Sequence, residues 1–366
     1  MRSSFGHIEP HGKDKWRVYW SENGTRKSKV IAGKKSDAEL FLAHRMIDKS
    51  GLVGHSMTYE EYWQYAVEPT FEGLSERTVY DYNRVWSVEL APRIGQKKVE
   101  ETNWRYAQAV LSRIKAPSVQ AHAYRTWRKI CNLAVRDGLL QSNPIDRNIR
   151  LKQVDKRDKV ILSRERMADV FTAAMAYKHL YLLALEIGCG LRHEEACAVT
   201  REDIAFEGRW AILSVSKALT VAGGKVIHKE TKTALSRRLV ACGEPFRSIL
   251  QANMDKIPAT VAQQSSPVTI TRNWKAYCTR NGIEYIPFGQ MRTQFSVMHM
   301  QAGSVDSLVS LAMGHADGTT RGRNYTVNTL PAMKLLADGL SEWLMESEKV
   351  RRCSTVFEEA AGQERM

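Results

Sequence analysis

The sequence predicts a multidomain, mainly α-helical protein: a small β-sheet-plus-helix unit first, a helical unit second, and a mixed α/β but mostly α unit third. The chain has 366 residues, enough for two or three units that each bury a core of their own. Apolar residues recur at helical spacing through most of the sequence after residue 57. Strand formers gather only near the N-terminus and in one stretch of the third unit, so the sheets should be small.

Residues 1–54 are expected to form the β-sheet-plus-helix unit. The run Trp-Arg-Val-Tyr-Trp at 16–20 is rich in strand formers and is followed by a turn signal at 22–24. Residues 25–31 should return as an edge strand, and Ser36 is a suitable N-cap for a following helix. The unit contains eleven Lys and Arg against six Asp and Glu. Either insertion into a DNA groove or a solvated charged face fits this excess.

Residues 55–150 are expected to form the helical unit. Thr58 and Ser75 are suitable N-caps for its first two helices, a third helix should span about 104–114, and Pro117 should open a fourth. Aromatic residues recur at helical spacing here, which favours a core role over base stacking. The basic residues between them are better candidates for phosphate contacts.

A charged linker is expected at 151–160, because seven of the residues 150–159 are charged. The third unit should then occupy 161–345 and be followed by a C-terminal tail at 346–366, whose residues 351–366 should be weakly ordered. The strands expected in the third unit are at 210–215, around Val226 and at 239–240.

The charge balance points to a polyanionic partner. Lys and Arg number 54 against 40 Asp and Glu, which gives a formal net charge of +14 and a pI near 9.5. Nucleic acid is the commonest such partner, and a basic protein without one is the alternative. The candidate DNA-binding residues are Arg17, Lys27, Lys29, Arg77, Arg84, Arg125, Arg128 and Lys129.

The cysteines and the apolar segments favour an intracellular protein. The six cysteines are scattered, with no CxxC pair and no metal-ligand spacing, so buried thiols are expected rather than disulfides or zinc sites. The N-terminus has no apolar run typical of a signal peptide, and no stretch approaches the length of a membrane span. We therefore expect a cytoplasmic protein that does not contact membranes.

Three clusters in the third unit carry residues suited to phosphate chemistry. The first, Gly-Cys-Gly-Leu-Arg-His-Glu-Glu at 188–195, contains glycines that allow a tight turn presenting Arg192 at the start of a helix. The second, at 231–240, has Thr-Lys-Thr and then Ser-Arg-Arg-Leu-Val on the return arm of the expected hairpin. The third, at 292–325, begins with Arg, continues with Gly-His and ends with Tyr.

In this order and at this spacing, the three clusters resemble the tyrosine recombinase, or phage integrase, family. Each motif alone is weak, but their co-occurrence in a basic chain of several units is specific. The resemblance covers essentially the whole chain. It implies an arm-type DNA-binding domain at 1–54, a core-binding domain at 55–150 and a catalytic domain at 161–345.

The resemblance also implies residue roles. Tyr325 would be the nucleophile that forms a 3′-phosphotyrosine bond with DNA, and Lys232 would be the general acid that protonates the leaving 5′-oxygen. Arg192 and Arg292 would bind the non-bridging oxygens, because arginine stays charged and can donate two parallel hydrogen bonds to a phosphate. His315 would hydrogen-bond the same phosphate.

Glu195 would support these residues by orienting neighbouring side chains. The covalent bond to the tyrosine conserves the energy of the cleaved phosphodiester, so the reaction implies no ATP. It also implies no metal ion, and we expect no cofactor.

One position departs from the family pattern. The family commonly has His, or sometimes Lys, three positions before its second Arg, whereas this chain has Gly289 three positions before Arg292. Three explanations stay open: Lys232, His315 or water takes over the proton transfer, Gln290 partly substitutes, or the protein is slow or inactive.

The resemblance implies an integrase that recombines double-stranded DNA attachment sites of a mobile element and a bacterial host chromosome, at the nucleoid. Its homotetramer on DNA would pass through a four-way junction, and the apolar helix at 331–345 could dock on a neighbouring subunit. A DNA-bending protein and a directionality factor are further candidate partners. The main alternative is a catalytically weak or inactive DNA-binding regulator, which Gly289 favours. A DNA-relaxing enzyme of the type IB topoisomerase kind fits less well, because relaxation needs no second recognition unit.

Overall fold

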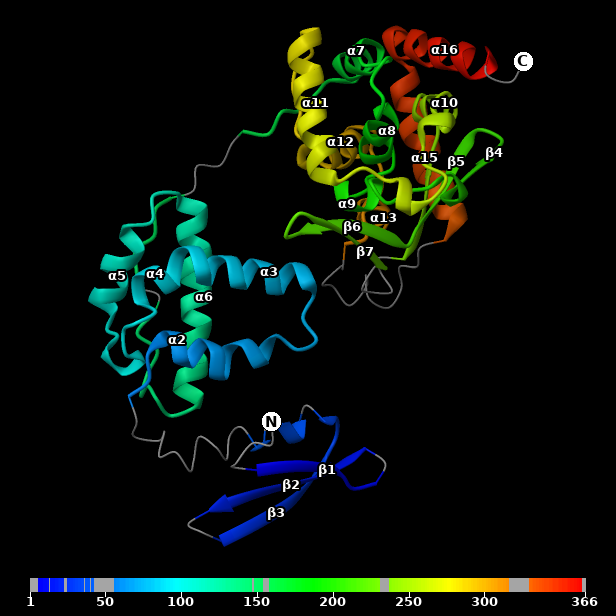
Figure 1. Cartoon of the computed structure of the whole chain (residues 1–366). Coiled ribbons are helices and arrows are strands. Elements are labelled where there is room, and N and C mark those ends of the chain that lie inside the picture. The colour runs from blue at the N-terminus through cyan, green and yellow to red at the C-terminus, as the bar shows by residue number, and fades with distance from the viewer. Residues whose placement is uncertain are drawn as a thin grey trace. The chain divides into compact units, whose positions relative to one another are not determined.

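The computed structural model divides the chain into two compact units, Met1–Lys156 and Arg157–Met366 (Figure 1). The first of these contains the two units expected at 1–54 and 55–150, and the second contains the unit expected at 161–345. From here on, first and second unit refer to these two. The residues that the structure describes are 6–12, 14–22, 25–35, 37–39, 41–42, 56–146, 148–153, 158–230, 237–315 and 329–363. Over these ranges, every helix is too short or too polar to cross a membrane. The protein is multidomain and mainly α-helical, as the sequence predicts.

The first unit begins with a three-stranded antiparallel sheet in the order β1–β2–β3. The strands are β1 (Gly6–Pro10), β2 (Lys15–Glu22) and β3 (Thr25–Ala32). Val18 and Trp20 on β2 pack with Ala38 and Leu42 from the helical stretch that follows, and these four residues form a small core. The two strands expected from the sequence are confirmed. β1 is an additional strand, and its short Gly-His-Ile-Glu-Pro sequence carries no apolar alternation.

The remainder of the first unit is helical and has a separate core. Its elements are α2 (Tyr59–Tyr62), η1 (Trp63–Val67), η2 (Glu68–Phe71), α3 (Glu76–Val85), η3 (Trp86–Leu90), α4 (Ala91–Ile94), η4 (Val99–Glu101), α5 (Trp104–Ser112) and α6 (Pro117–Arg136). Thr58 forms a capping box with Glu61, Ser75 caps α3, and Pro117 is the first residue of α6. The expected helix starts are therefore confirmed. The fully buried Trp127 on α6 is part of this core.

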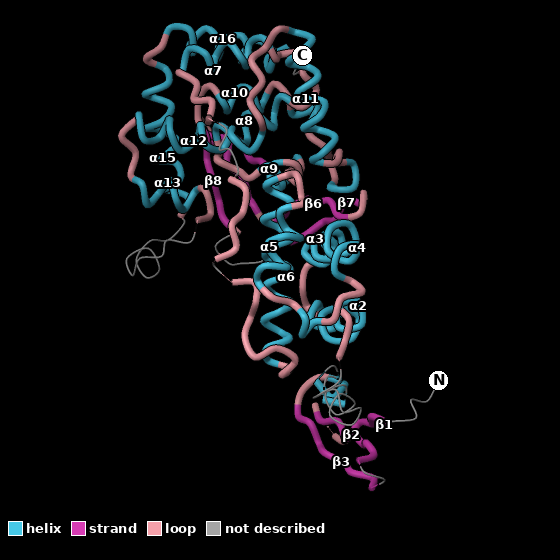
Figure 2. Tube along the Cα trace, turned by 90° about the vertical axis from the view of Figure 1, so that its left-hand side faces the viewer, coloured by secondary structure: helices cyan, strands magenta, loops and turns pink. Residues whose placement is uncertain are grey.

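In the second unit, helix α8 is buried along its whole length. The helical elements of this unit are α7 (Arg164–Ala173), α8 (Leu180–Gly188), α9 (His193–Ala196), η5 (Arg201–Asp203), α10 (Phe246–Gln251), η7 (Met254–Lys256), η8 (Val261–Gln263), α11 (Pro267–Asn281), α12 (Phe288–Gln301), α13 (Asp306–Ala312), α15 (Leu330–Met345) and α16 (Glu348–Gln363). Every residue of α8 is buried, and both α10 and α12 pack against it (Figure 2). Its sequence, apolar except for Glu186, is thus that of a buried helix.

The strands of the second unit form a sheet and a separate hairpin. The sheet has the order β4–β5–β8, with β4 (Ile204–Glu207), β5 (Trp210–Val215) and β8 (Arg238–Cys242) all antiparallel. The hairpin consists of β6 (Lys217–Ala222) and β7 (Lys225–Glu230). Its turn residues Gly223 and Gly224 both have positive φ, which the Gly-Gly pair allows without strain. The expected strands exist. However, β7 pairs with β6 in the hairpin, whereas β8 pairs with β5 in the sheet.

The C-terminal segment is more ordered than the sequence analysis expects. Weak order is expected at 351–366, yet α16 is a regular helix that packs on α7 and α10. Val350, Cys353 and Phe357 lie in the main core of the second unit. Their spacing of three and four residues is that of one helical face, and the charged residues between them mask this pattern in the sequence. The expectation of weak order is therefore wrong for residues 351–363, where the structure describes this segment.

Candidate active site

Arg192 is presented by the turn between α8 and α9. Gly190 has φ +67°, and a Cβ at this position would come within 2.7 Å of the Phe295 ring. Only glycine fits this turn without displacing a neighbour. Arg192 follows as the N-cap of α9, with its side chain 44% exposed. The tight turn expected before Arg192 is confirmed.

Glu195 lies beneath the site and binds the arginines around it. Its Oε1 accepts a hydrogen bond from Arg192 Nη1 at 2.8 Å, and its Oε2 accepts one from the Arg192 backbone N–H at 2.9 Å. Arg292 Nη1 is 3.8 Å from the Oε2 atom. Burial opposes ionisation of Glu195, but the bonds from Arg238 and Arg192 outweigh it and lower the pKa. A buried carboxylate therefore fixes the positions of the cations.

Arg238 is the site residue that the sequence analysis did not assign. It begins β8, and its Nη2 donates to Glu195 Oε2 at 2.8 Å while its Nε donates to the Ala312 carbonyl at 2.6 Å. Its side chain is 1% exposed. The signal in the sequence was the Ser-Arg-Arg-Leu-Val run, in which strand alternation directs only one of the two arginines inward. Arg237, the other arginine, is 60% exposed and pairs with Glu230.

Arg292 projects from α12 into the same cluster. Its Nη1 donates to the Gly190 carbonyl at 2.8 Å, and its Nη2 donates to the Met313 carbonyl and to His315 Nε2, the latter at 2.8 Å. Burial, and then repulsion from Arg192, lowers the pKa of Arg292 to about 10. The guanidinium is therefore still charged at neutral pH, and two backbone carbonyls hold it in place.

His315 follows α13 and completes the described part of the cluster. Because Nε2 accepts a hydrogen bond from Arg292, it carries no proton and the ring is neutral. Burial and the charges of Arg292 and Arg192 lower the pKa of His315. Arg192 Nη2 also donates to the carbonyl of Gly314, the residue before His315, at 3.2 Å. The structure thus brings together Arg192, Arg292, His315 and Glu195, as the sequence analysis expects of one site.

Two expected catalytic residues lie outside the described part of the chain. Lys232 is in the sequence between β7 and β8, and Tyr325 is between His315 and α15. Their assigned roles stay predictions.

Gly289, the position that departs from the family pattern, lies in the first turn of α12. A Cβ at Gly289 would meet no atom of the described residues within 4 Å, so there is room for a side chain. The neighbouring Gln290 uses its side-chain carbonyl to accept a hydrogen bond from the Val160 backbone N–H at 3.0 Å. Gln290 therefore has a structural contact that competes with a catalytic role.

The basic candidates of the N-terminal sheet do not share one face. Lys27 pairs with Trp20 and Lys29 with Val18, so both lysines lie on the face that carries the small core. Lys29 Nζ is 5.1 Å from the centre of the Phe41 ring. Arg17 lies on the opposite face, where it hydrogen-bonds His11. DNA contact by all three residues would therefore need both sides or the edge of this sheet.

The basic candidates of the helical part lie on α3 and α6. On α3, Arg84 is exposed and Arg77 forms an ion pair with Asp81 at 2.9 Å. On α6, the polar residues continue beyond the basic candidates predicted from the sequence, because Asn132 and Arg136 follow at helical spacing on the same face. This α6 polar face consists of Arg125, Arg128, Lys129, Asn132 and Arg136.

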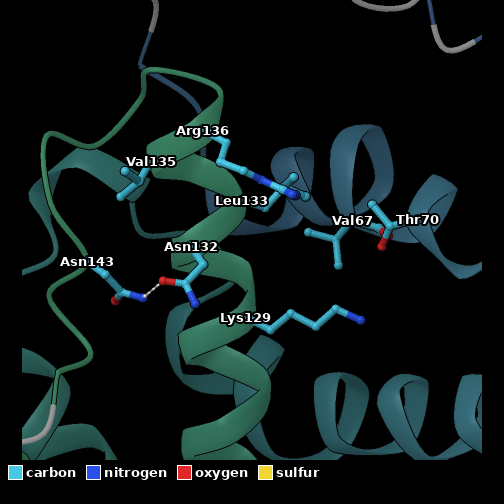
Figure 3. Close-up of a pocket in the computed structure, with 8 residues that line it drawn as sticks. All are labelled: Val67, Thr70, Lys129, Asn132, Leu133, Val135, Arg136 and Asn143. Carbon is cyan, nitrogen blue, oxygen red and sulfur yellow. Dashed lines mark hydrogen bonds between the residues drawn. The ribbon is translucent and has the colours of Figure 1, made fainter.

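A pocket of about 750 Å³ adjoins the α6 polar face (Figure 3). The side chains of Lys129 and Arg136 extend from α6 toward Val67 and Thr70. Lys129 Nζ is 4.2 Å from the centre of the Tyr82 ring, a cation–π contact between α6 and α3. Asn143 donates to Asn132 Oδ1 at 2.6 Å, which fixes the orientation of that amide.

Comparisons with known proteins show that this chain is similar to phage integrases. Residues 155–330 match the model of the Phage integrase family. The integrase of Mycobacterium phage FRAT1 is 25% identical over 317 residues, which cover 76% of this chain and 90% of the relative. The integrase of Mycobacterium phage L5 is 24% identical over 271 residues, which cover 65% of this chain and 72% of the relative.

Two solved structures of integrases in complex with DNA have the same fold as this chain. The Tn1549 transposon integrase in complex with a circular intermediate DNA has a TM-score of 0.62 at 17% identity, covering 78% of this chain and 100% of that chain. A lambda integrase dimer bound to a core site has a TM-score of 0.54 at 14% identity, covering 90% and 99%. At these identities the likeness shows a shared fold.

Proposed function

Because residues 155–330 match the phage integrase family and phage integrases are among the relatives of this chain, we propose that the chain is a tyrosine recombinase, a site-specific DNA recombinase that cleaves and rejoins strands through a 3′-phosphotyrosine bond. The observation that most supports this proposal is the cluster of charged and polar side chains in the candidate active site. Arg192 and Arg292 lie beside His315 over the buried carboxylate of Glu195. Two fixed guanidiniums next to an imidazole form a site that suits a phosphate with growing negative charge.

The proposed reaction begins with attack of the Tyr325 hydroxyl on the scissile phosphorus. The phenol has an ordinary pKa near 10, so it needs the positive field of Arg192 and Arg292 to become a nucleophile, and its proton passes to Lys232, His315 or water as the bond to phosphorus forms. The bond to the 5′-oxygen breaks as Lys232 donates a proton to that oxygen. The 5′-hydroxyl of a partner strand then attacks the phosphotyrosine, which releases Tyr325 and restores the phosphodiester.

The described contacts support different roles for the two arginines. Arg292 is almost buried and held by two carbonyls, so it supplies a charge whose position changes little. The side chain of Arg192 is nearly half exposed, so its guanidinium is accessible to a DNA phosphate that approaches from solvent. His315 accepts from Arg292 through Nε2, which leaves its Nδ1–H to donate to a phosphate oxygen.

We assign DNA binding to the first unit as part of the same proposal. Residues 1–54 would bind arm-type sites and 55–150 the core site, with the α6 polar face among the phosphate contacts. The working form would be a homotetramer that passes through a four-way junction while a mobile element is integrated or excised. A lambda integrase tetramer bound to a Holliday junction has the same fold at a TM-score of 0.52.

The second candidate function is a DNA-binding regulator that is catalytically weak or inactive. Gly289 favours it, because this position lacks the ionisable side chain common in the family. The two candidates differ in a single measurable event, the formation of a covalent bond to DNA.

A nicked suicide duplex separates the two functions. Duplexes tiled from the DNA flanking the gene are incubated with the full-length protein, and covalent complexes are resolved on a denaturing gel. The recombinase forms a complex that Tyr325→Phe abolishes. Tyr277→Phe is the matched control, because this tyrosine packs against Tyr177 and Trp274 in an aromatic cluster. Tight DNA binding by the wild type without a covalent complex would favour the regulator.

A further inference from the structure

A buried acid–imidazole pair lies directly behind Arg192. Glu186, on helix α8, is completely buried, and its Oε1 is 2.7 Å from Nδ1 of His193. Its other oxygen, Oε2, has no hydrogen-bond partner among the described residues. A buried carboxylate is costly unless it is paired, so the position of His193 compensates for Glu186.

The hydrogen bonds of His193 show where the protons lie. Its Nε2 is 3.2 Å from the Pro267 carbonyl and 3.2 Å from Thr271 Oγ1. Thr271 donates its own hydroxyl hydrogen to the Pro267 carbonyl at 2.9 Å, so both neighbours of Nε2 are acceptors. When Glu186 is ionised, Nδ1 also faces an acceptor, and the ring then makes all its contacts only with hydrogen on both nitrogens.

The same ring connects the helices that carry the two catalytic-site arginines. His193 is the first residue of α9, directly after Arg192, and it bonds to α8 and α11. It also stacks on Phe288 of α12, with ring centres 4.3 Å apart. Phe288 is four residues, about one helical turn, before Arg292.

We propose that His193 and Glu186 form an imidazolium–carboxylate positioning pair that sets the placement of Arg192 relative to Arg292 and is lost when the pair releases its proton to solvent at alkaline pH. The inference rests on the proposed function for its effect on cleavage. His193 and Glu186 are positioning residues, because they act through the arginines and not on the phosphate.

The electrostatic surroundings agree with this geometry. Burial raises the pKa of Glu186 to about 7, and the hydrogen bond and charge of His193 oppose that rise. Burial would lower the pKa of His193, but the hydrogen bond and charge of Glu186 outweigh it and the pKa is raised. The other groups that face the pair are Glu194 and the Cys197 thiol on α9 and the Arg292 guanidinium on α12. Glu194 strengthens the retention of the proton on His193, and Arg292 opposes the rise at Glu186.

The test compares three variants of the full-length protein with the wild type: Glu186→Gln, His193→Phe and the double apolar variant Glu186→Leu/His193→Phe. The readouts are the rate of covalent complex formation on the suicide duplex from pH 6 to 9, the DNA affinity and the Tm. We expect Glu186→Gln and His193→Phe to slow cleavage roughly tenfold to a hundredfold through misplacement of Arg192, with DNA affinity little changed. The alkaline fall of the wild-type rate should be absent in Glu186→Gln.

The double variant separates positioning from packing. An apolar pair of similar volume is expected to restore the Tm, because it removes both buried charges together. Under the proposal its cleavage stays slow. Wild-type cleavage with the wild-type pH profile in the double variant, or in Glu186→Gln, would overturn it.

A measurement on the wild type makes the proposal independent of both folding defects and cleavage. With ¹⁵N-labelled histidine, the ring of His193, assigned through its contact with the Phe288 ring, should carry hydrogen on both nitrogens at pH 7.5. A neutral ring at that pH rejects the pair. If the wild type forms no covalent complex on any duplex, the proposed function fails, and this spectrum still decides the state of the pair.

Discussion

Arg238 and Glu195 form an ion pair that is almost completely buried, with Nη2 and Oε2 2.8 Å apart and side chains 1% and 4% exposed. The same carboxylate also binds Arg192 and lies near Arg292. Three guanidiniums thus share one acidic group. Because the arginines repel one another, their spacing depends on Glu195, and the position of Glu195 depends on Arg238.

Arg238→Met should therefore destabilise the second unit and impair cleavage together. Removing one partner of a buried pair leaves an uncompensated charge, which costs about 3–5 kcal/mol. Chemical denaturation measures the free energy of unfolding, and the suicide duplex measures cleavage. Arg237→Met is the matched control, since that neighbouring side chain is exposed and its ion pair with Glu230 should contribute little. Equal unfolding free energies for the two variants would contradict the assigned role of Arg238.

Gly190→Ala should be more harmful than a glycine substitution at an open turn. A residue with a side chain at φ +67° has backbone strain of about 1–3 kcal/mol, and here the Cβ also meets the Phe295 ring. Gly208→Ala is the control, because Gly208 has φ +56° but open space around its Cβ position. We expect a larger loss of unfolding free energy for Gly190→Ala, together with slower cleavage because Arg192 follows this turn. A loss no larger than in the control would show that Phe295 moves aside at little cost.

The sequence predicted the elements that depend on local chemistry. The caps at Thr58 and Ser75, the Pro117 helix start and the turn before Arg192 all follow from residue preferences over a few positions. The motif clusters predicted that Arg192, Arg292, His315 and Glu195 belong together, and the structure confirms that they lie in one cluster.

The contacts that the sequence could not predict are those between distant segments. Arg238 has the same local sequence character as the exposed Arg237, and only the pairing of β8 with β5 directs it inward. Glu186 interrupts an apolar helix, and its partner His193 was part of a motif assigned to Arg192. The helix at 348–363 was missed because its apolar residues gain their importance from packing on α7 and α10.

Acidification should weaken the contact between His315 and Arg292. The pKa of His315 is lowered, so the ring is neutral at pH 7 and its contribution to stability is present above its ordinary value of about 6.5. That contribution is lost as the pH falls through the lowered pKa, because a protonated Nε2 cannot accept from Arg292. In a Tm titration from pH 7.5 to 5, His315→Gln should lose less Tm than the wild type. His122→Gln, at an exposed position on α6, should follow the wild-type curve. Identical curves for all three proteins would contradict this assignment.

The α6 polar face should contribute to DNA affinity in a salt-dependent way. Each phosphate contact that is lost lowers the slope of log K against log salt concentration by about 1. Arg136→Ala and Arg128→Ala should each show this decrease in fluorescence anisotropy titrations with duplex DNA. Arg113→Ala, an exposed arginine at the end of α5, should keep the wild-type slope. An unchanged slope in both α6 variants would place the DNA elsewhere on this unit.

Gly289→His tests how the missing side chain is compensated. The position is in the first turn of α12, three residues before Arg292, and a Cβ there has open space around it among the described residues. We therefore expect the variant to fold with a Tm close to that of the wild type. An imidazole at this position can take a proton from the nucleophile, and such general-base assistance typically accelerates a reaction by about 10²-fold or more. Gly289→Ala is the control for the change in helix stability alone. A higher cleavage rate in Gly289→His but not in Gly289→Ala would mean that the wild type works without a dedicated base. Unchanged rates in both would mean that another group of the site already performs the proton transfer, and the pH profile of His315→Gln then shows whether that group is His315.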